Sequence, residues 1–115
     1  MDENLKKALE YSKYMITLNN QKRVILEQYN ENLNFYFNGG KFFISQQLLS
    51  FCKMLLDCNQ KSVVLIDDDG VPIEIADLES FLKSILSQYS SVSNKYLAEY
   101  QKLAKQRSVQ GIVSL

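Results

Sequence analysis

The stretch VVLIDDDGVPIEI, residues 63–75, places three consecutive aspartates and a glycine between two apolar runs rich in β-branched residues. Asp-Gly between such runs is a strong hairpin signal, because glycine readily adopts the positive φ that tight hairpin turns require. Pro72 has no N–H to donate to a strand ladder, so it marks its strand as an edge. We therefore expect a β-hairpin at about residues 63–75 with a solvated acidic tip.

The same aspartates, Asp67 to Asp69, can be compared with a calcium-binding loop. Such a loop needs an oxygen ligand at its first position and a bidentate carboxylate at its twelfth. When Gly70 is aligned with the loop glycine, Leu65 occupies the first position and Ala76 the twelfth. The stretch therefore predicts a turn and no metal site, and a weak contact with a divalent ion or a basic partner is the alternative.

Two long helices are expected on either side of this middle region. The first has no proline or glycine from Asp2 to about Phe37, and the second begins after Asp77, a good N-cap residue, and continues to about Arg107. Lys22 fills the one vacant position in the helical pattern of the first segment. Residues at helical spacing are Ala8, Tyr11, Met15, Leu18, Ile25, Tyr29, Leu33 and Tyr36, followed by Leu78, Phe81, Leu82, Ile85, Tyr89, Val92, Tyr96, Tyr100 and Leu103. We expect the two helices to pair as an antiparallel, coiled-coil-like hairpin.

A compact segment is expected between the long helices. Asn38-Gly39-Gly40 ends the first helix, because Asn and Gly tolerate the left-handed conformation of a helix end. Residues 41–44 form a short extended piece, and Ser45 caps a short helix over about residues 46–57. The predicted fold is therefore α+β and mainly α, with a long antiparallel helical hairpin, a short third helix and one β-hairpin. Residues 1–107 form a single domain, and residues 108–115 form an apolar C-terminal tail that either frays or docks.

Composition narrows the function classes. Thirteen basic and thirteen acidic residues give a formal net charge of zero, so a whole-molecule electrostatic footprint for nucleic acid or an anionic membrane is missing. The chain has no histidine, which removes the commonest general acid–base group and every Ser-His-Asp or Cys-His arrangement. We therefore expect a non-enzymatic protein without a cofactor.

The two cysteines and the hydropathy pattern indicate a reducing, cytoplasmic setting without a membrane partner. Cys52 and Cys58 are six residues apart and match no metal-binding pattern. Both are expected to be reduced and to be buried as small hydrophobic side chains. No run approaches the roughly 20 apolar residues that a membrane-spanning helix needs.

Aromatic residues are the candidates for protein interaction. One group brackets the double glycine, where core packing at the helix turn explains it. A protein-binding surface is the alternative, because so many aromatic side chains on a short segment are difficult to bury all at once. The other lies along the seam of the second long helix, where positions are expected to be covered by other elements or other chains. The candidates are Phe35, Tyr36, Phe42, Phe43, Tyr89, Tyr96 and Tyr100.

The end of the second long helix is basic, with Lys95, Lys102, Lys105 and Arg107. Cations near a helix C-terminus are favoured by the helix dipole, so a solvated helix end explains them. The functional alternative is a phosphate-binding patch in which Tyr96 and Tyr100 stack on nucleobases.

Three stretches together carry a resemblance: FNGGKFFISQQLLSFCKMLL, VVLIDDDGVPIEIADLESFL and YLAEYQKLAKQR. They resemble small proteins of no assigned activity from tailed phages of the T4-like group, particularly marine ones, over about Leu5 to Arg107. The layout of two long helices around a β-hairpin is also similar to that of prefoldin-type chaperone subunits, in architecture only.

The expected function is that of a protein-interaction module that binds itself, another protein, or both. The phage resemblance implies a small structural, assembly or accessory factor, in the host cytoplasm or in the virion. The alternative is a nucleic-acid-binding accessory factor in recombination or transcription that uses the basic helix end.

Overall fold

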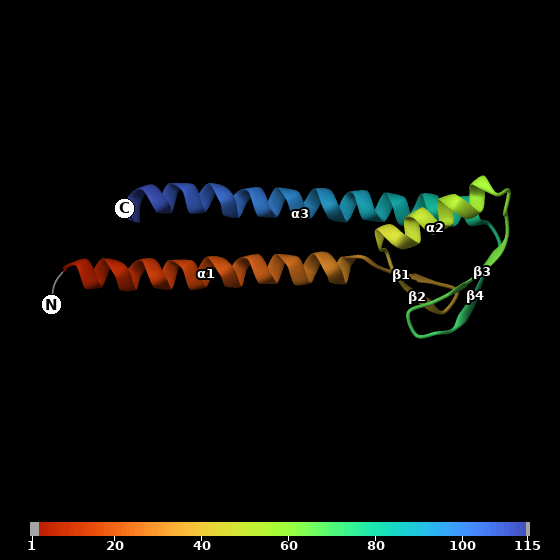
Figure 1. The fold of residues 1–115 in the computed structure, drawn as a ribbon, viewed down its shortest axis with the longest axis horizontal. Helices are drawn as coiled ribbons and strands as arrows, with labels where there is room; N and C mark the ends of the chain where they lie inside the picture. The colour runs from red at the N-terminus through yellow and green to blue at the C-terminus, as the bar shows by residue number, and fades with distance from the viewer. Residues whose placement is uncertain (1–2, 115) are drawn as a thin grey trace. The chain divides into compact units, whose positions relative to one another are not determined.

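The computed structural model describes the backbone of residues 3–114 and the side chains of residues 3–105. Its elements follow the order α1 (Glu3–Asn32), β1 (Asn34–Phe37), β2 (Gly40–Phe43), α2 (Gln46–Asp57), β3 (Val63–Ile66), β4 (Pro72–Ile75) and α3 (Leu78–Ser114) (Figure 1). The mixed and mainly helical fold class is confirmed. The chain divides into two compact units: unit 1 comprises residues 1–29 and 94–115, and unit 2 comprises residues 30–93.

The first helix is shorter than predicted, because residues 34–37 form a strand. β1 pairs antiparallel with β2 through a two-residue turn in which Asn38 has φ 48° and Gly39 has φ 79°. Asn-Gly with both residues at positive φ is the preferred two-residue hairpin turn, since its twist matches that of the flanking strands. The expectation that Asn38 and Gly39 end a helix, and that the chain has only one β-hairpin, was wrong.

The predicted β-hairpin at residues 63–75 is confirmed. β3 pairs antiparallel with β4, with Val63 opposite Ile75 and Ile66 opposite Pro72. Gly70 has φ 80°, and the N–H of Asp67 donates to the carbonyl of Val71 at 2.9 Å to close the loop. The alternation of the strands turns Leu65, Ile73 and Ile75 inward, where each is at most 6% exposed.

Both predicted helix caps form. The Ser45 hydroxyl accepts from the N–H of Leu48 at 3.0 Å, and the Asp77 carboxylate accepts from the N–H of Ser80 at 3.1 Å. α3 continues beyond Arg107 to Ser114, so residues 108–114 extend the helix and do not form a separate tail. The segment contains no proline, and its single Gly111 weakens a helix without ending it. The side chains of residues 106–115 lie outside the described part, so docking by this segment stays a prediction.

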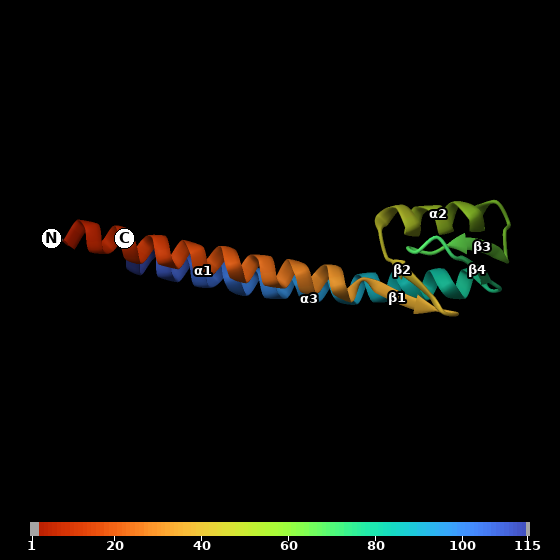
Figure 2. The same ribbon diagram turned by 90° about the horizontal axis from the view of Figure 1, so that it is seen from below.

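Phe81 of α3 organises the core of unit 2. The rings of Phe35, Phe37 and Phe42 each meet the Phe81 ring edge-on, with centroids 5.4–5.6 Å apart. In Figure 1 both hairpins lie below α2 and the first turns of α3, and in Figure 2, which is seen from below, β3 runs between these two helices. The two hairpins also approach each other closely, because a Cβ on Gly40 would lie 2.7 Å from Cγ1 of Ile73.

The described side chains of unit 1 come from two helix segments. Leu18 of α1 and Leu103 of α3 are 2% and 8% exposed. The rings of Tyr29 and Tyr96 stack with centroids 4.7 Å apart. Lys22 is half-buried with its Nζ 5.7 Å from the centroid of the Tyr100 ring.

Candidate protein-interaction surface

The Asp67 carboxylate is a structural acceptor at the junction of the two hairpins. Its Oδ1 accepts from the N–H groups of Val71 at 2.8 Å and Asp69 at 2.9 Å, and its Oδ2 accepts from the N–H of Lys41 at 3.2 Å. Asp67 is only 8% exposed, whereas Asp68 and Asp69 are exposed. The predicted solvated acidic tip is therefore wrong for Asp67, because this side chain is needed to satisfy backbone donors of the loop and of β2.

These hydrogen bonds set the ionisation of Asp67. The N–H of Val71 lowers the pKa of the carboxyl most, and the N–H groups of Lys41 and Asp69 lower it further, because each bond favours the charged form. Removal from water raises the pKa, but this effect is smaller than the combined hydrogen bonds, so the pKa lies below its ordinary value.

Asp68 completes the contact between the loop and β2. Its Oδ1 accepts from the N–H of Phe43 at 3.2 Å, and its own N–H donates to the carbonyl of Lys41 at 2.9 Å. Together with the bond from Lys41 to Asp67, these contacts use the outward-pointing backbone groups of β2. The aspartate loop thus occupies the outer edge of β2 and blocks it against another strand.

The outer edges of β1 and β4 are also obstructed. The carbonyl of Asn34 in β1 accepts from Nε2 of Gln88 at 3.0 Å. In β4, Pro72 has no N–H, and the carbonyl of Glu74 accepts from Nδ2 of Asn38 at 3.2 Å. Of the outward-pointing residues on these two edges, Tyr36 alone keeps both backbone groups unpaired within the described chain.

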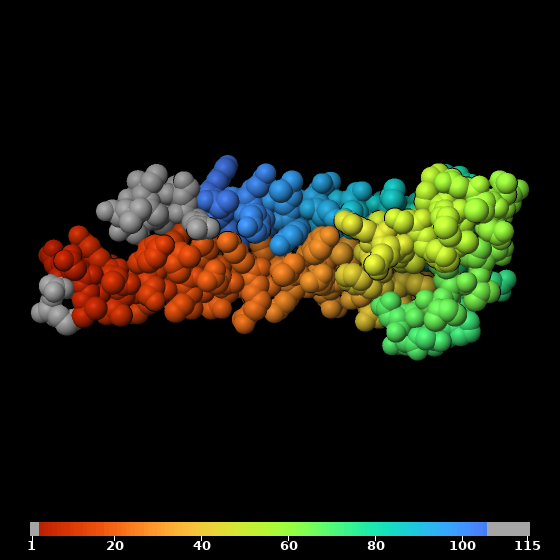
Figure 3. All heavy atoms as spheres, in the orientation of Figure 1, coloured from red at the N-terminus to blue at the C-terminus, as the bar shows by residue number. Residues whose placement is uncertain are grey.

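The outer edge of β3 is open. The N–H of Asp67 donates to the carbonyl of Val71, so the backbone groups of Asp67 are directed toward β4. The backbone groups of successive residues in an antiparallel strand alternate in direction, so the N–H and C=O groups of Val64 and Ile66 face away from β4. No group in the described part of the chain hydrogen-bonds to them. Their side chains are 61% and 63% exposed. In the space-filling view the green loop region of this hairpin projects from the rest of unit 2 (Figure 3).

The four aromatic candidates around the first hairpin separate into core and surface residues. Phe42 is 2% exposed against Phe81, and Phe35 is half-buried. Tyr36 and Phe43 are 69% and 38% exposed. Alternation along β1 and β2 explains the separation, because neighbouring side chains of a strand point to opposite faces.

The three tyrosine candidates lie on α3 and contact different parts of the chain. The hydroxyl of Tyr89 lies 3.3 Å from Nε2 of Gln46 in unit 2. Tyr96 is half-buried against Tyr29, and Tyr100 is 41% exposed beside Lys22.

The lysine candidates are exposed on α3 as far as their side chains are described. Lys95, Lys102 and Lys105 are exposed, and the side chain of Arg107 lies outside the described residues. Lys102 follows Tyr100 by two residues, which places it on nearly the opposite side of the helix. Lys102 and Tyr100 therefore do not share a face of α3, and the phosphate-binding patch stays a prediction.

Six exposed apolar side chains of unit 2 were not identified from the sequence: Phe51, Met54, Val64, Ile66, Val71 and Leu86. A signal for the β3 pair was present, since β4 carries Pro72 and Glu74 whereas β3 carries no charged or strand-breaking residue. Of the cysteines, Cys52 is buried, which raises the pKa of its thiol, while Cys58 is exposed, contrary to expectation.

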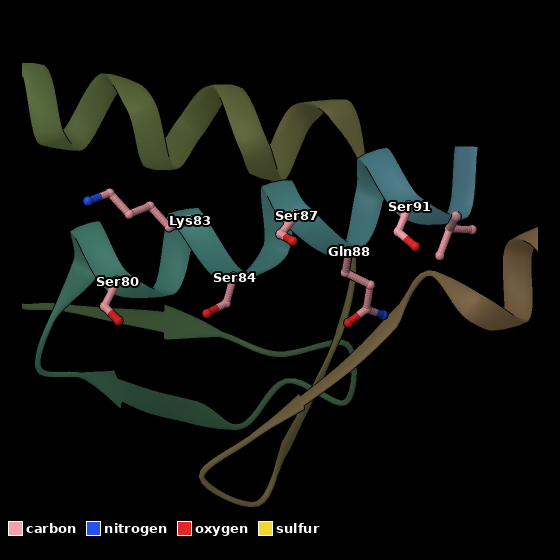
Figure 4. A pocket seen from close by; sticks show the side chains of 7 residues that line it. Ser80, Lys83, Ser84, Ser87, Gln88 and Ser91 are labelled. Atoms are coloured by element: carbon pink, nitrogen blue, oxygen red, sulfur yellow. The ribbon is translucent and has the colours of Figure 1, made fainter. Parts of the chain in front are cut away.

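A shallow groove follows the first turns of α3 and is lined mainly by serines (Figure 4). Ser80, Ser84, Ser87 and Ser91 recur at helical spacing, and Gln88 points from the same helix toward the start of β1. Its Nε2 donates to the carbonyl of Asn34 in β1 and to that of Asn32 at the end of α1. Gln88 is thus a structural residue of this groove. Among the described residues, no three His, Cys, Asp or Glu side chains are grouped as metal ligands, and no helix has the length and hydropathy of a membrane span.

Comparison of the chain with protein-family models, with curated proteins and with solved structures finds no match.

Replacing Asp67 with Asn removes the negative charge that three backbone donors stabilise. Because the folded pKa of Asp67 is depressed, its contribution to stability is full above the ordinary aspartate pKa of about 3.9 and is lost as the pH falls through the folded value. We expect Asp67→Asn to have a lower melting temperature than the parent protein at pH 7, with a smaller difference in acid.

Asp69→Asn is the matched control, because it changes the same charge on an exposed side chain of the same loop. Thermal unfolding followed by circular dichroism from pH 2 to pH 7 measures both variants. Equal melting temperatures for the two variants across this range would contradict the role given to Asp67.

Proposed function

We propose that this chain is a non-enzymatic protein-interaction module that associates with copies of itself. The observation that carries the proposal is the outer edge of β3, where Val64 and Ile66 expose their β-branched side chains and have no hydrogen bond to their backbone groups within the described chain. An unprotected apolar strand edge favours pairing with another strand. Zero formal net charge supports the proposal, because copies of the chain repel one another only weakly.

The biological setting of the module is proposed from the sequence resemblance alone. A small self-associating protein with the quoted stretches fits a structural, assembly or accessory factor of a tailed phage. The nucleic-acid alternative has less support, because Lys102 lies opposite Tyr100 on α3 and Tyr96 is stacked on Tyr29.

The helices of unit 1 are proposed to pair as an antiparallel hairpin. Two contacts support this direction: Tyr29 of α1 lies against Tyr96 of α3, and the earlier residue Lys22 lies beside the later residue Tyr100. The burial of Leu18 at a predicted seam position supports this pairing. Its interface is rich in tyrosine and contains a lysine, so packing is wetter than in a leucine zipper.

Replacing Leu18 with Ala tests the helical pairing. If α3 covers this 2% exposed side chain, the substitution removes buried apolar area and leaves a cavity, and we expect a loss of about 2–5 kcal/mol in the free energy of unfolding. Leu9→Ala is the control, because Leu9 lies on the same helix and is 54% exposed. Urea unfolding measures both, and similar small losses would count against the pairing.

The molar mass of the untagged chain tests self-association. Size-exclusion chromatography with light scattering, over a range of protein concentrations and at two salt concentrations, is expected to give a mass that rises above the 13.3 kDa of one chain. The apolar character of the exposed edge predicts that added salt does not dissociate the assembly. A constant mass of one chain at every concentration would overturn the proposed function.

A further inference from the structure

We propose that β3 pairs antiparallel with β3 of a second copy, with Val64 opposite Ile66 of that copy and the two-fold axis at Leu65. The two hairpins then form one four-stranded antiparallel sheet. This inference rests on the proposed self-association and names its surface, its partner and its register.

Backbone geometry limits the registers. Only Val64 and Ile66 of β3 direct their N–H and C=O groups outward, so these residues must form the hydrogen-bonded pairs with a second strand. A two-fold pairing can therefore be centred on Val64, on Leu65 or on Ile66. Only in the register centred on Leu65 do both outward residues of one copy, Val64 and Ile66, pair with the outward residues of the other copy.

Side-chain chemistry favours the same register. With Leu65 on the axis, Val64 of each copy faces Ile66 of the other, and four β-branched side chains that are each more than 60% exposed cover one another. A centre at Val64 places Ile66 opposite Ser62, and a centre at Ile66 places Val64 opposite Asp68. Both alternatives leave an apolar side chain against a polar one.

Self-complementarity of the exposed side chains identifies a second copy as the occupant. In the register centred on Leu65, a second copy supplies Ile66 against Val64 on one side of the two-fold axis and Val64 against Ile66 on the other. The same strand therefore provides an apolar, β-branched side chain at both facing positions.

The surroundings of β3 direct the pairing to this strand. The edge of β2 is occupied by Asp67 and Asp68, and β4 is protected by Pro72 and by the bond to Glu74. Among the described strands, only β3 offers a second strand two successive outward-pointing residues whose N–H and C=O groups are all unpaired.

Cysteine cross-linking tests the register directly. Val64→Cys and Ile66→Cys are made separately in a Cys58→Ser background, which removes the exposed natural thiol and leaves the buried Cys52. Facing residues of a hydrogen-bonded pair have Cα atoms about 5.5 Å apart, within disulfide reach, whereas diagonal neighbours are about 7–8 Å apart. Oxidation by diamide is therefore expected to cross-link the mixture of the two variants far more than either variant alone.

Molar mass measured on Ile66→Lys separates this inference from the proposed function. The substitution places a charge in the apolar pairing and is expected to give a single chain, whereas Leu86→Lys, at an exposed position on α3, keeps the mass of the parent protein. Far-ultraviolet circular dichroism confirms that both variants are folded.

Each outcome decides between the two proposals. Cross-linking of one variant with itself in preference to the mixture overturns the register. A parent mass above 13.3 kDa that Ile66→Lys leaves unchanged overturns pairing through β3 while self-association stands. A parent protein that stays a single chain at every concentration overturns both.

Discussion

The Asp67 carboxylate joins the two hairpins of unit 2, and most of the local structure depends on it. A single side chain receives N–H groups from Val71 and Asp69 in its own loop and from Lys41 in β2, 26 residues earlier in the chain. A buried carboxylate requires such donors, because an unpaired charge removed from water is costly. The charge and the loop geometry therefore support each other: the loop presents the donors, and the carboxylate holds the loop against β2.

This contact also determines which surfaces stay available. Isolated two-stranded hairpins are only marginally stable, so each hairpin in this chain needs support from another element. The aspartate loop supports β2 along its outer edge, and Phe81 and its ring contacts support the inner side of β1 and β2. Because the loop of the second hairpin is used in this way, β3 is left at the outside with an apolar, unpaired edge. The proposed interaction surface is thus a consequence of how the two hairpins stabilise each other.

The parts of the fold that depend on neighbouring residues were predictable from the sequence. Ser45 and Asp77 cap their helices as expected, and Asp-Gly specifies the second hairpin, because each signal acts over a few residues. The first hairpin could also have been predicted from Asn38 and Gly39. The long uninterrupted helical pattern before them led to the wrong choice between a helix end and a hairpin turn, two structures that both use positive φ at these residues.

The candidate surface depends on contacts between distant residues, and these were not predictable. No local pattern shows that Asp67 binds Lys41, that Asp68 binds Phe43, or that Gly40 must admit Ile73. Without knowledge of these contacts, the sequence predicts that the aspartates form a solvated tip. It also does not show which of the four strands has the free edge. The same limit applied to the aromatic residues, since only the pairing of β1 with β2 shows that Phe42 is buried and Tyr36 exposed.

Amide hydrogen exchange, followed by NMR at low and high protein concentration, tests the central claim that Asp67 closes one strand edge and leaves another open for a second copy. The account predicts that the N–H groups of Lys41, Phe43 and Val71 exchange slowly at both concentrations. It predicts that those of Val64 and Ile66 exchange rapidly in dilute solution and become protected as the concentration rises. Protection of Val64 and Ile66 in the dilute single chain, or rapid exchange at Lys41 and Val71, would contradict it.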